Sequence, residues 1–277
     1  MERYRLLVRR FGGPEAIERE EIGSLEPAAG EATVRHEAVG LNFIDTYHRS
    51  GLYPVGLPSG LGSEAAGVVE AVGSGVEGFA PADRVGYFTG PPGAYATHRS
   101  VAADRLVKLP EGIGAETAAA AMLKGCTAEY LIERCARVRA GQTVLVHAAA
   151  GGVGSILVQW LKAIGATVIA HAGSVEKAAT ARALGADQAL SCPMAELAAE
   201  VRGLTGGEGV PVVLDGVGAA SWQASLGALA RRGLLVTYGN ASGPVPPASC
   251  APDPAPEESA AARNSNRENP AIALCMS

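Results

Sequence analysis

The sequence predicts an α/β protein in which a β-rich N-terminal domain precedes a doubly wound parallel sheet. Three observations predict this class. From residue 143 to residue 243, short β-branched apolar runs alternate with segments of helical periodicity, and glycines mark the connections. The first 125 residues instead contain short alternating segments broken by glycine and proline, as antiparallel β domains do. A helical run at residues 117–131 joins the two patterns.

The parallel sheet is expected to contain five strands. Its first strand is the apolar run Val144–Val146, which is typical of a strand buried on both faces. In the segment that follows, apolar residues recur at the spacing of a helix that packs on the sheet, namely Ile156, Leu157, Trp160, Leu161 and Ile164. The other expected strands are Ala166–Ala172, Gln188–Leu190, Pro211–Val217 and Leu234–Asn240, and the helices between them are Ser174–Leu184, Ala195–Leu204 and Ser221–Ala230.

A glycine turn between the first strand and its helix predicts a dinucleotide site. Ala149, Gly151 and Gly154 fill the small-residue positions of G-x-G-x-x-G, with alanine in the first. Small residues permit a tight turn and a close approach of the backbone to a pyrophosphate, which the helix N-terminus attracts. The alternative is a glycine-rich turn without a ligand, but the succession of strands and helices favours the ligand. The expected cofactor contacts here are Ala150, Gly151, Gly152, Val153 and Gly154.

The end of the second strand favours NADPH over NADH. NAD sites usually place Asp or Glu about twenty residues past the fingerprint, to accept from the ribose 2′-hydroxyl. Here the strand ends in His171 and Ala172, and no carboxylate stands at that position. Gly173, Ser174 and Lys177 follow, and they offer backbone, hydroxyl and ammonium donors to a 2′-phosphate. The alternative for Lys177 taken alone is a solvated helix residue.

Composition limits the classes of partner. The 277 residues are 48% hydrophobic and 18% charged, and their net charge of −5 argues against a polyanion such as nucleic acid as the main partner. The N-terminus lacks the apolar core of a signal peptide, and no segment resembles a membrane span, so we expect a cytoplasmic protein. None of the five cysteines forms a C-x-x-C pair or a zinc-ligand spacing, which predicts reduced thiols.

Three stretches carry a specific resemblance to a known family. They are NFIDTYHRSGLYP (Asn42–Pro54), LPSGLGSEAAGVVEAVGSGV (Leu57–Val76) and HAAAGGVG (His147–Gly154). Together they resemble the zeta-crystallin-like quinone oxidoreductases of the medium-chain dehydrogenase/reductase superfamily, and the similarity runs to about Gly243. The resemblance implies a GroES-like substrate domain at 1–125 and a Rossmann NADPH-binding domain at 126–243, followed by a tail at 244–277.

The resemblance also implies hydride transfer from NADPH to a quinone without zinc. The zinc enzymes of the superfamily carry G-H-E where this chain has Gly62, Ser63 and Glu64, and no cysteine precedes Cys126. A zinc site needs three or four nitrogen or sulfur ligands, so neither a catalytic nor a structural zinc is expected. A quinone accepts hydride readily, and one-electron products also occur in the family.

Site residues are carried over by the same resemblance. Asn42 and Asp45 would lie beside the nicotinamide and its ribose, with Asn42 also counted as catalytic. Tyr47 and Tyr53 would orient the quinone or donate a proton, although each could equally be a packing aromatic. The remaining implied cofactor contacts are Lys124, Thr127 and Tyr130, and at the ends of the fourth and fifth strands Asp215, Val217, Tyr238, Gly239 and Asn240.

The chain departs from the family in two places. Cys192 stands where the family often has a tyrosine that helps to hold the adenosine phosphate. From about Pro247 the family's sixth strand and return to the first domain are absent, and residues 244–277 contain seven prolines without periodicity, so we expect a disordered tail. We therefore expect the homodimer typical of the family to be weakened or lost here, and activity to fall.

Two other functions stay open. On the same scaffold, NADPH could reduce the activated double bond of an alkenal or enone. A non-catalytic form could bind the cofactor or single-stranded RNA, as some zeta-crystallin relatives do, although the acidic balance makes nucleic acid the weakest of these options.

Overall fold

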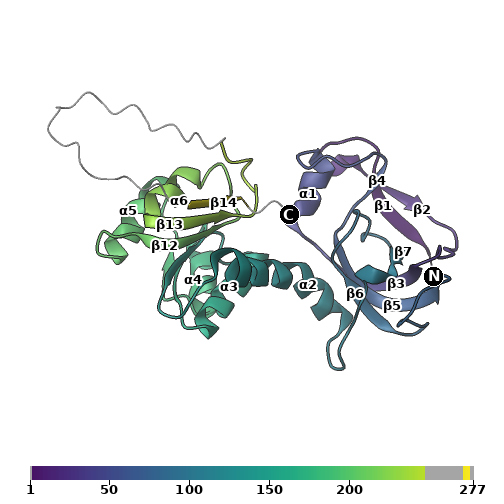
Figure 1. The fold of residues 1–277 in the computed structure, drawn as a ribbon. Coiled ribbons are helices and arrows are strands. Elements are labelled where there is room, and N and C mark those ends of the chain that lie inside the picture. The colour runs from purple at the N-terminus through teal and green to yellow at the C-terminus, as the bar shows by residue number, and fades with distance from the viewer. Residues whose placement is uncertain (1, 247–270, 275–277) are drawn as a thin grey trace. The chain divides into compact units, whose positions relative to one another are not determined.

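The computed structural model describes residues 2–246 and 271–274 and divides the chain into two compact units (Figure 1). The first unit is Met1–Cys126 and the second is Thr127–Ser277. Each contains its own sheets and its own apolar core. The α/β class, with a β-rich first part and a parallel sheet in the second, is as predicted.

The first unit is built on a five-stranded antiparallel sheet. Its strands lie in the order β7-β3-β5-β6-β8. Apolar side chains that alternate along these strands, among them Val34, Val69 and Tyr87, meet in one buried cluster. The bounds of the five strands are β3 Glu31–Gly40, β5 Glu64–Val72, β6 Arg84–Tyr87, β7 His98–Ala102 and β8 Val107–Lys108.

A second, three-stranded sheet of order β2-β1-β4 completes the unit. The sequence prediction missed its strands, which are β1 Tyr4–Val8, β2 Ile17–Glu21 and β4 Ser59–Gly60. Ion pairs such as Arg5 with Glu20 cover its exposed face, so its pattern is less apolar than that of a buried strand. The helices of the unit are η1 Pro14–Ala16, α1 Phe43–Ser50 and η2 Ala103–Arg105.

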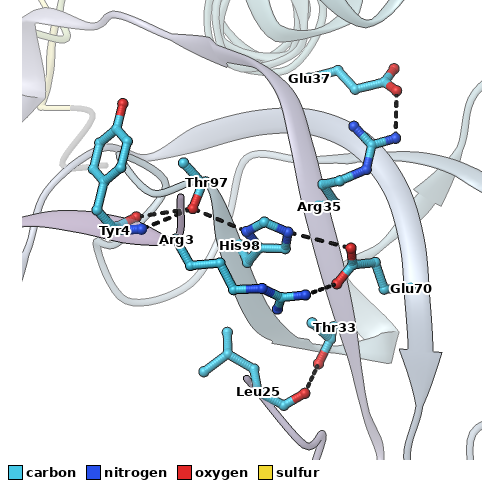
Figure 2. A network of polar contacts seen from close by, with 9 residues as sticks. All are labelled: Arg3, Tyr4, Leu25, Thr33, Arg35, Glu37, Glu70, Thr97 and His98. Carbon is cyan, nitrogen blue, oxygen red and sulfur yellow. Dashed lines mark hydrogen bonds and ion pairs between the residues drawn. The ribbon is translucent and has the colours of Figure 1, made fainter. Parts of the chain in front are cut away.

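Polar contacts tie β1 to the larger sheet (Figure 2). Thr97 Oγ1 accepts from the Tyr4 backbone N–H at 3.0 Å, and the next residue, His98, lies with Nε2 3.3 Å from Glu70 Oε1. Glu70 also accepts from Arg3 at 3.1 Å. Burial lowers the pKa of His98, so these contacts hold mainly as hydrogen bonds of a neutral ring.

The second unit contains a six-stranded, wholly parallel sheet in the order β11-β10-β9-β12-β13-β14. In chain order this is 3-2-1-4-5-6, the arrangement of a dinucleotide-binding sheet, whose direction of winding reverses between β9 and β12. The strand bounds are β9 Thr143–Val146, β10 Thr167–His171, β11 Gln188–Leu190, β12 Val210–Asp215, β13 Leu229–Thr237 and β14 Ala271–Leu274. The helices are α3 Gly152–Ala163, α4 Val175–Ala183, α5 Met194–Leu204 and α6 Trp222–Ala228.

Alternation along the strands supplies two cores, one on each face of this sheet. Val144 and Val146 pack with Leu157 of α3, whereas Leu145 packs with Leu197 of α5 and Trp222 of α6. Helices therefore cover both faces (Figure 1). Each fully buried Leu or Val contributes about 1.5–3 kcal/mol to folding, so this sheet is a rigid support for the loops at its carboxyl edge.

The helix that joins the two sequence patterns is longer than predicted. It runs as α2 from Ala115 to Glu129 and continues as a π-helix, η3, from Tyr130 to Ala136. The π-helix ends at Arg137 with a left-handed backbone, and the Val138 N–H donates to the Ile132 carbonyl. Periodicity of 3.6 residues cannot signal a wider turn, which is why the sequence prediction stopped at residue 131.

The prediction that the sixth strand is missing is wrong. Residues of the C-terminal segment form β14, which pairs in parallel with β13 in the register Leu234↔Ala271 to Thr237↔Leu274. A four-residue apolar run is too short to show a period, and the unpaired edge of β13 offers it a full set of backbone partners. Val245 also packs on the apolar cluster around Leu145, so the start of the predicted tail is ordered. Residues 247–270 and 275–277 lie outside the described residues.

Candidate active site

The β9–α3 turn has the shape that the fingerprint predicts. Gly151 and Gly152 begin α3, whose first turn has no side-chain cap and contains no acidic residue. A Cβ on Gly154 would lie 2.3 Å from the Ala148 carbonyl oxygen, so only glycine lets the helix approach the turn this closely. The N–H groups and positive end of α3 thus face the loop side, as an anionic phosphate requires. The predicted residues Ala150 and Val153 lie in the same turn.

The β10–α4 turn holds the residues predicted to read the 2′-phosphate. Ser174 caps α4 by accepting from the Lys177 N–H at 3.3 Å, which explains why a serine begins this helix. The sequence reasoning overlooked Glu176. A hydrogen bond from Ser174 lowers the pKa of that carboxyl, so a fully ionised acid stands between the predicted serine and lysine. Gly173 has open space where a Cβ would be.

A buried carboxylate organises the carboxyl end of β12. Asp215 is 1% exposed, and four donors meet it. Its Oδ1 accepts from the Val217 and Gly218 N–H groups at 2.8 and 3.4 Å. Its Oδ2 accepts from the Ser221 and Ser225 hydroxyls, both at 2.7 Å. Asp215 was predicted to contact the cofactor, but protein donors already surround both of its oxygens.

His147 extends this cluster to the end of β9. Its ring is fully buried, and Nε2 lies 2.9 Å from Ser225 Oγ. Because Ser225 gives its proton to Asp215, His147 must donate from Nε2, and its Nδ1 then has no partner among the described residues. Burial lowers the pKa of His147 to about 4, so the ring is neutral near pH 7. The cluster spans β9 and β12, the two strands at which the winding of the sheet reverses.

The end of β13 packs against the same place. The Tyr238 N–H donates to the Asp215 carbonyl at 2.9 Å, and the tyrosine ring lies against Gly216. Burial and the nearby Asp215 charge raise the pKa of Tyr238, which keeps its phenol protonated. Gly239 and Asn240 follow directly. The structure thus brings together the residues predicted at the ends of the fourth and fifth strands.

In the first unit, a second buried carboxylate joins three predicted or neighbouring groups. Glu64, at the start of β5, is 0% exposed. Its Oε1 accepts from Asn42 Nδ2 at 2.8 Å and from Lys124 Nζ at 2.9 Å, and its Oε2 accepts from the Leu123 N–H at 2.7 Å. A Cβ on Gly40 would lie 2.2 Å from Glu64 Cγ, so a glycine makes room for this side chain.

Asp45 forms the neighbouring half of this cluster. It is the third residue of α1, and its Oδ2 accepts from the Asn42 N–H at 2.9 Å, which is half of a capping box. Oδ2 also accepts from Tyr95 OH at 2.6 Å, and Oδ1 accepts from Ser63 Oγ at 2.8 Å. Burial and these hydrogen-bond and charge interactions with Asp45 raise the pKa of Tyr95, so this phenol stays protonated.

Aromatic rings line α1 beside this cluster. The rings of Tyr47 and Tyr53 lie 5.0 Å apart at a tilt, and the Phe43 ring meets Tyr47 edge-on at 5.5 Å. Tyr47 is buried, Tyr53 is partly buried and Phe43 is 58% exposed. This packing is compatible both with the predicted role of the two tyrosines and with the alternative of packing aromatics.

Several members of these clusters were not among the predicted site residues. Glu64, Ser63 and Tyr95 surround Asn42 and Asp45, and His147, Ser221 and Ser225 surround Asp215. A charged residue at the start of the apolar strand EAAGVV was the one available signal for Glu64. Thr127 lies on α2 and Tyr130 begins η3, where Tyr130 is 45% exposed. No group of three or more His, Cys, Asp or Glu in the described ranges could hold a metal ion.

The fold and these clusters define a two-part oxidoreductase of the alcohol dehydrogenase type. Two family models match: "Alcohol dehydrogenase GroES-like domain" at residues 28–111 and "Zinc-binding dehydrogenase" at residues 152–263. These matches confirm the medium-chain dehydrogenase/reductase superfamily, to which the sequence resemblance pointed. No helix in residues 2–246 is long and apolar enough to cross a membrane.

Individual relatives narrow the class. The quinone oxidoreductase of Pseudomonas aeruginosa is 53% identical over 236 residues, which cover 85% of this chain and 73% of that protein. The crystal structure of Escherichia coli quinone oxidoreductase complexed with NADPH matches with a TM-score of 0.86 and 44% identity, over 89% of this chain and 76% of that one. The 2-haloacrylate reductase of a Burkholderia species is 42% identical over 247 residues, covering 87% of this chain and 74% of that protein. The chain belongs to the quinone oxidoreductase family.

Proposed function

We propose that the chain reduces quinones with NADPH and without zinc. The observation that carries this proposal is the match to quinone oxidoreductases over most of the chain, one of which is described with NADPH bound. The geometry of each unit supports it. The second unit offers a phosphate-binding turn, and the first unit offers a polar cluster next to aromatic rings.

The residues of the second unit fit NADPH. The uncapped, acid-free N-terminus of α3 would hold the pyrophosphate. Gly173, Ser174 and Lys177 would hold the 2′-phosphate, and the loops after β12 and β13, with Val217, Tyr238, Gly239 and Asn240, would line the crevice where the winding reverses. Asp215 would act through the loop that it holds. When bound, NADPH supplies the hydride.

In the first unit, Asn42 and Lys124 would present polar groups to the nicotinamide side and the acceptor, and Asp45 would act by holding Asn42 and Tyr95. Tyr47 or Tyr53 would donate a hydrogen bond or proton to a quinone oxygen. Thr127 and Tyr130 would contact the cofactor ribose and phosphates.

The position and hydrogen bond of Ser63 support zinc independence. This residue stands where zinc enzymes of the superfamily have a histidine, and its hydroxyl donates to Asp45. A serine hydroxyl is not among the usual zinc ligands.

We also propose that the enzyme acts in the cytoplasm on small molecules.

Oxidation of NADPH by the purified chain tests the proposal. Absorbance at the reduced nicotinamide band is followed with 1,4-benzoquinone and with 9,10-phenanthrenequinone, each against NADH as the alternative cofactor. We expect turnover with NADPH, a weaker rate with NADH, unchanged rates after treatment with a chelator, and less than stoichiometric zinc by elemental analysis. Absence of quinone turnover, or one zinc bound per chain and loss of activity on its removal, would refute the respective part of the proposal.

A second candidate is reduction of an activated carbon–carbon double bond. It is favoured by the 42% identity to 2-haloacrylate reductase. The same assay with a conjugated enal and with 2-chloroacrylate separates the two functions. We expect quinones to give the higher kcat/KM, and a higher value for either alkene would replace quinone reduction by this second function.

A further inference from the structure

We infer that Glu64 is a specificity-determining residue that, together with Asp45, selects an electrically neutral acceptor. The inference rests on the proposed function, because it assumes that the acceptor binds beside Asn42. It goes further by stating which acceptors are admitted: quinones and enones without a carboxylate or sulfonate group.

The first step is the charge of the cluster. Glu64 and Asp45 are 0% and 5% exposed, and both accept hydrogen bonds from groups that stabilise a carboxylate. Lys124 is the cation that the described residues place against them, and it pairs with Glu64. Two carboxylates and one ammonium leave a net charge of about −1 in a region largely shielded from solvent.

The second step is that the two basic side chains of α1 do not compensate this negative charge. His48 lies on α1 with Asp45, but burial lowers its pKa and favours the neutral ring. Arg49, on the same helix, donates from Nε to the Gly12 carbonyl, and its positive charge acts on Glu15, whose pKa it helps to lower. The negative field is visible at Tyr95, where the charges of Asp45 and Glu64 add to burial in raising the pKa of the phenol.

The third step is that the position of Glu64 is built into the fold. Gly40 leaves the volume that the Glu64 side chain fills, and donors from the N-cap of α1 and from α2 converge on its two carboxylate oxygens. Because Lys124 Nζ lies 2.9 Å from Glu64 Oε1, the Glu64 carboxylate already offsets the positive charge of the ammonium. Lys124 can therefore donate a hydrogen bond to an acceptor oxygen, but it offers little net attraction to an anion.

A matched pair of quinones tests this inference. The kcat/KM values of 1,2-naphthoquinone and 1,2-naphthoquinone-4-sulfonate are compared at low ionic strength in the wild type, in Glu64→Gln and in Glu70→Gln. Glu70 is on the same strand but pairs with Arg3, so it is the control. We expect the wild type to prefer the neutral quinone about tenfold. Glu64→Gln should narrow that ratio about sevenfold, as expected for one charge some 7 Å away at an effective dielectric of about 40.

We compare the ratio of the two kcat/KM values because structural damage lowers both of them together. Removal of a charge changes the ratio, since only one of the two quinones is charged. A preference that stays the same in Glu64→Gln, or that shifts equally in Glu70→Gln, would overturn the inference. If the wild type turns over neither quinone, the proposed function fails, and methyl acrylate against acrylate then gives the same charge comparison. Equal rates on both members of a pair that is turned over would refute neutral selection while leaving the enzyme function intact.

Discussion

Glu64 begins a strand in the first unit and Asp215 ends one in the second, and both are fully buried carboxylates, yet their hydrogen-bond donors come from different kinds of places. Asp215 draws its four donors from positions 217 to 225, all of them neutral. Glu64 draws its donors from residues 42, 123 and 124, and one of them carries a charge. A carboxylate surrounded by local neutral donors stabilises a loop. One that gathers distant polar groups can instead arrange a site for a ligand.

The largest expected effect tests the structural role of Asp215. Asp215→Ala leaves the Ser225 hydroxyl and two backbone N–H groups without this acceptor, while the Ser221 hydroxyl keeps the Gly218 carbonyl, so we expect a loss of about 3–5 kcal/mol in the free energy of unfolding. Urea titration measures it. Asp215→Asn is the matched control, since it keeps one oxygen for the backbone donors, and it should cost about half as much. Equal costs would show that the acceptor oxygens are not what matters.

Gly40→Ala tests how tightly the Glu64 side chain is packed against its neighbours. The added Cβ would lie 2.2 Å from both Glu64 Cγ and the Ala119 carbonyl, so strand and helix must separate, at a cost of about 1–3 kcal/mol. Thermal unfolding of the variant is compared with that of Gly23→Ala, where nothing lies within 4 Å of the new atom. The control should be neutral or slightly stabilising. A neutral Gly40→Ala would mean that Glu64 is held loosely.

Histidine titration sharpens the comparison, because His147 hydrogen-bonds within the Asp215 cluster, whereas the partners that the described residues give Glu64 include no histidine. Burial lowers the pKa of His147 from 6.5 to about 4. Below pH 6.5 the unfolded chain therefore binds more protons than the folded one, and stability falls as the pH drops from 6.5 to 4.5. We expect His147 to contribute about 1–3 kcal/mol to this loss.

Denaturant midpoints measured from pH 7.5 to 4.5 check the titration. His147→Gln should flatten the slope. His36, which is partly buried in the first unit with its pKa also lowered to about 4, contributes a similar slope that the substitution leaves in place. An unchanged slope in His147→Gln would contradict the assignment.

The smallest expected effect concerns cofactor choice at the β10–α4 turn, away from either buried carboxylate. Lys177→Glu should weaken the binding of NADPH about tenfold more than the binding of NADH, since it places a carboxylate near the 2′-phosphate. Removal of the neighbouring carboxylate in Glu176→Gln should shift the preference a few-fold in the opposite direction. Fluorescence titration with both cofactors measures the dissociation constants. Equal changes for both cofactors would show that Lys177 does not contact the phosphate.

Much of the second unit follows from local sequence alone. The strand Val144–Val146, the glycine turn and the helix after it are each encoded within about twenty residues, so periodicity and small-residue spacing predict them. The resemblance added Asn42, Asp45 and Lys124, and the structure brings all three to one cluster in the first unit.

The tertiary structure alone decided the partners of these residues. Glu64 meets Lys124 across 60 positions, His147 meets Ser225 across 78, and β14 reaches its place beside β13 from a segment with no helical or strand period. Such pairings depend on which strands become neighbours in a sheet. Composition and residue spacing do not predict which strands these are. The sequence therefore determined the elements and the phosphate-binding turn. Which side chains surround each buried carboxylate was decided by folding, because buried charges must find their donors wherever the chain brings them.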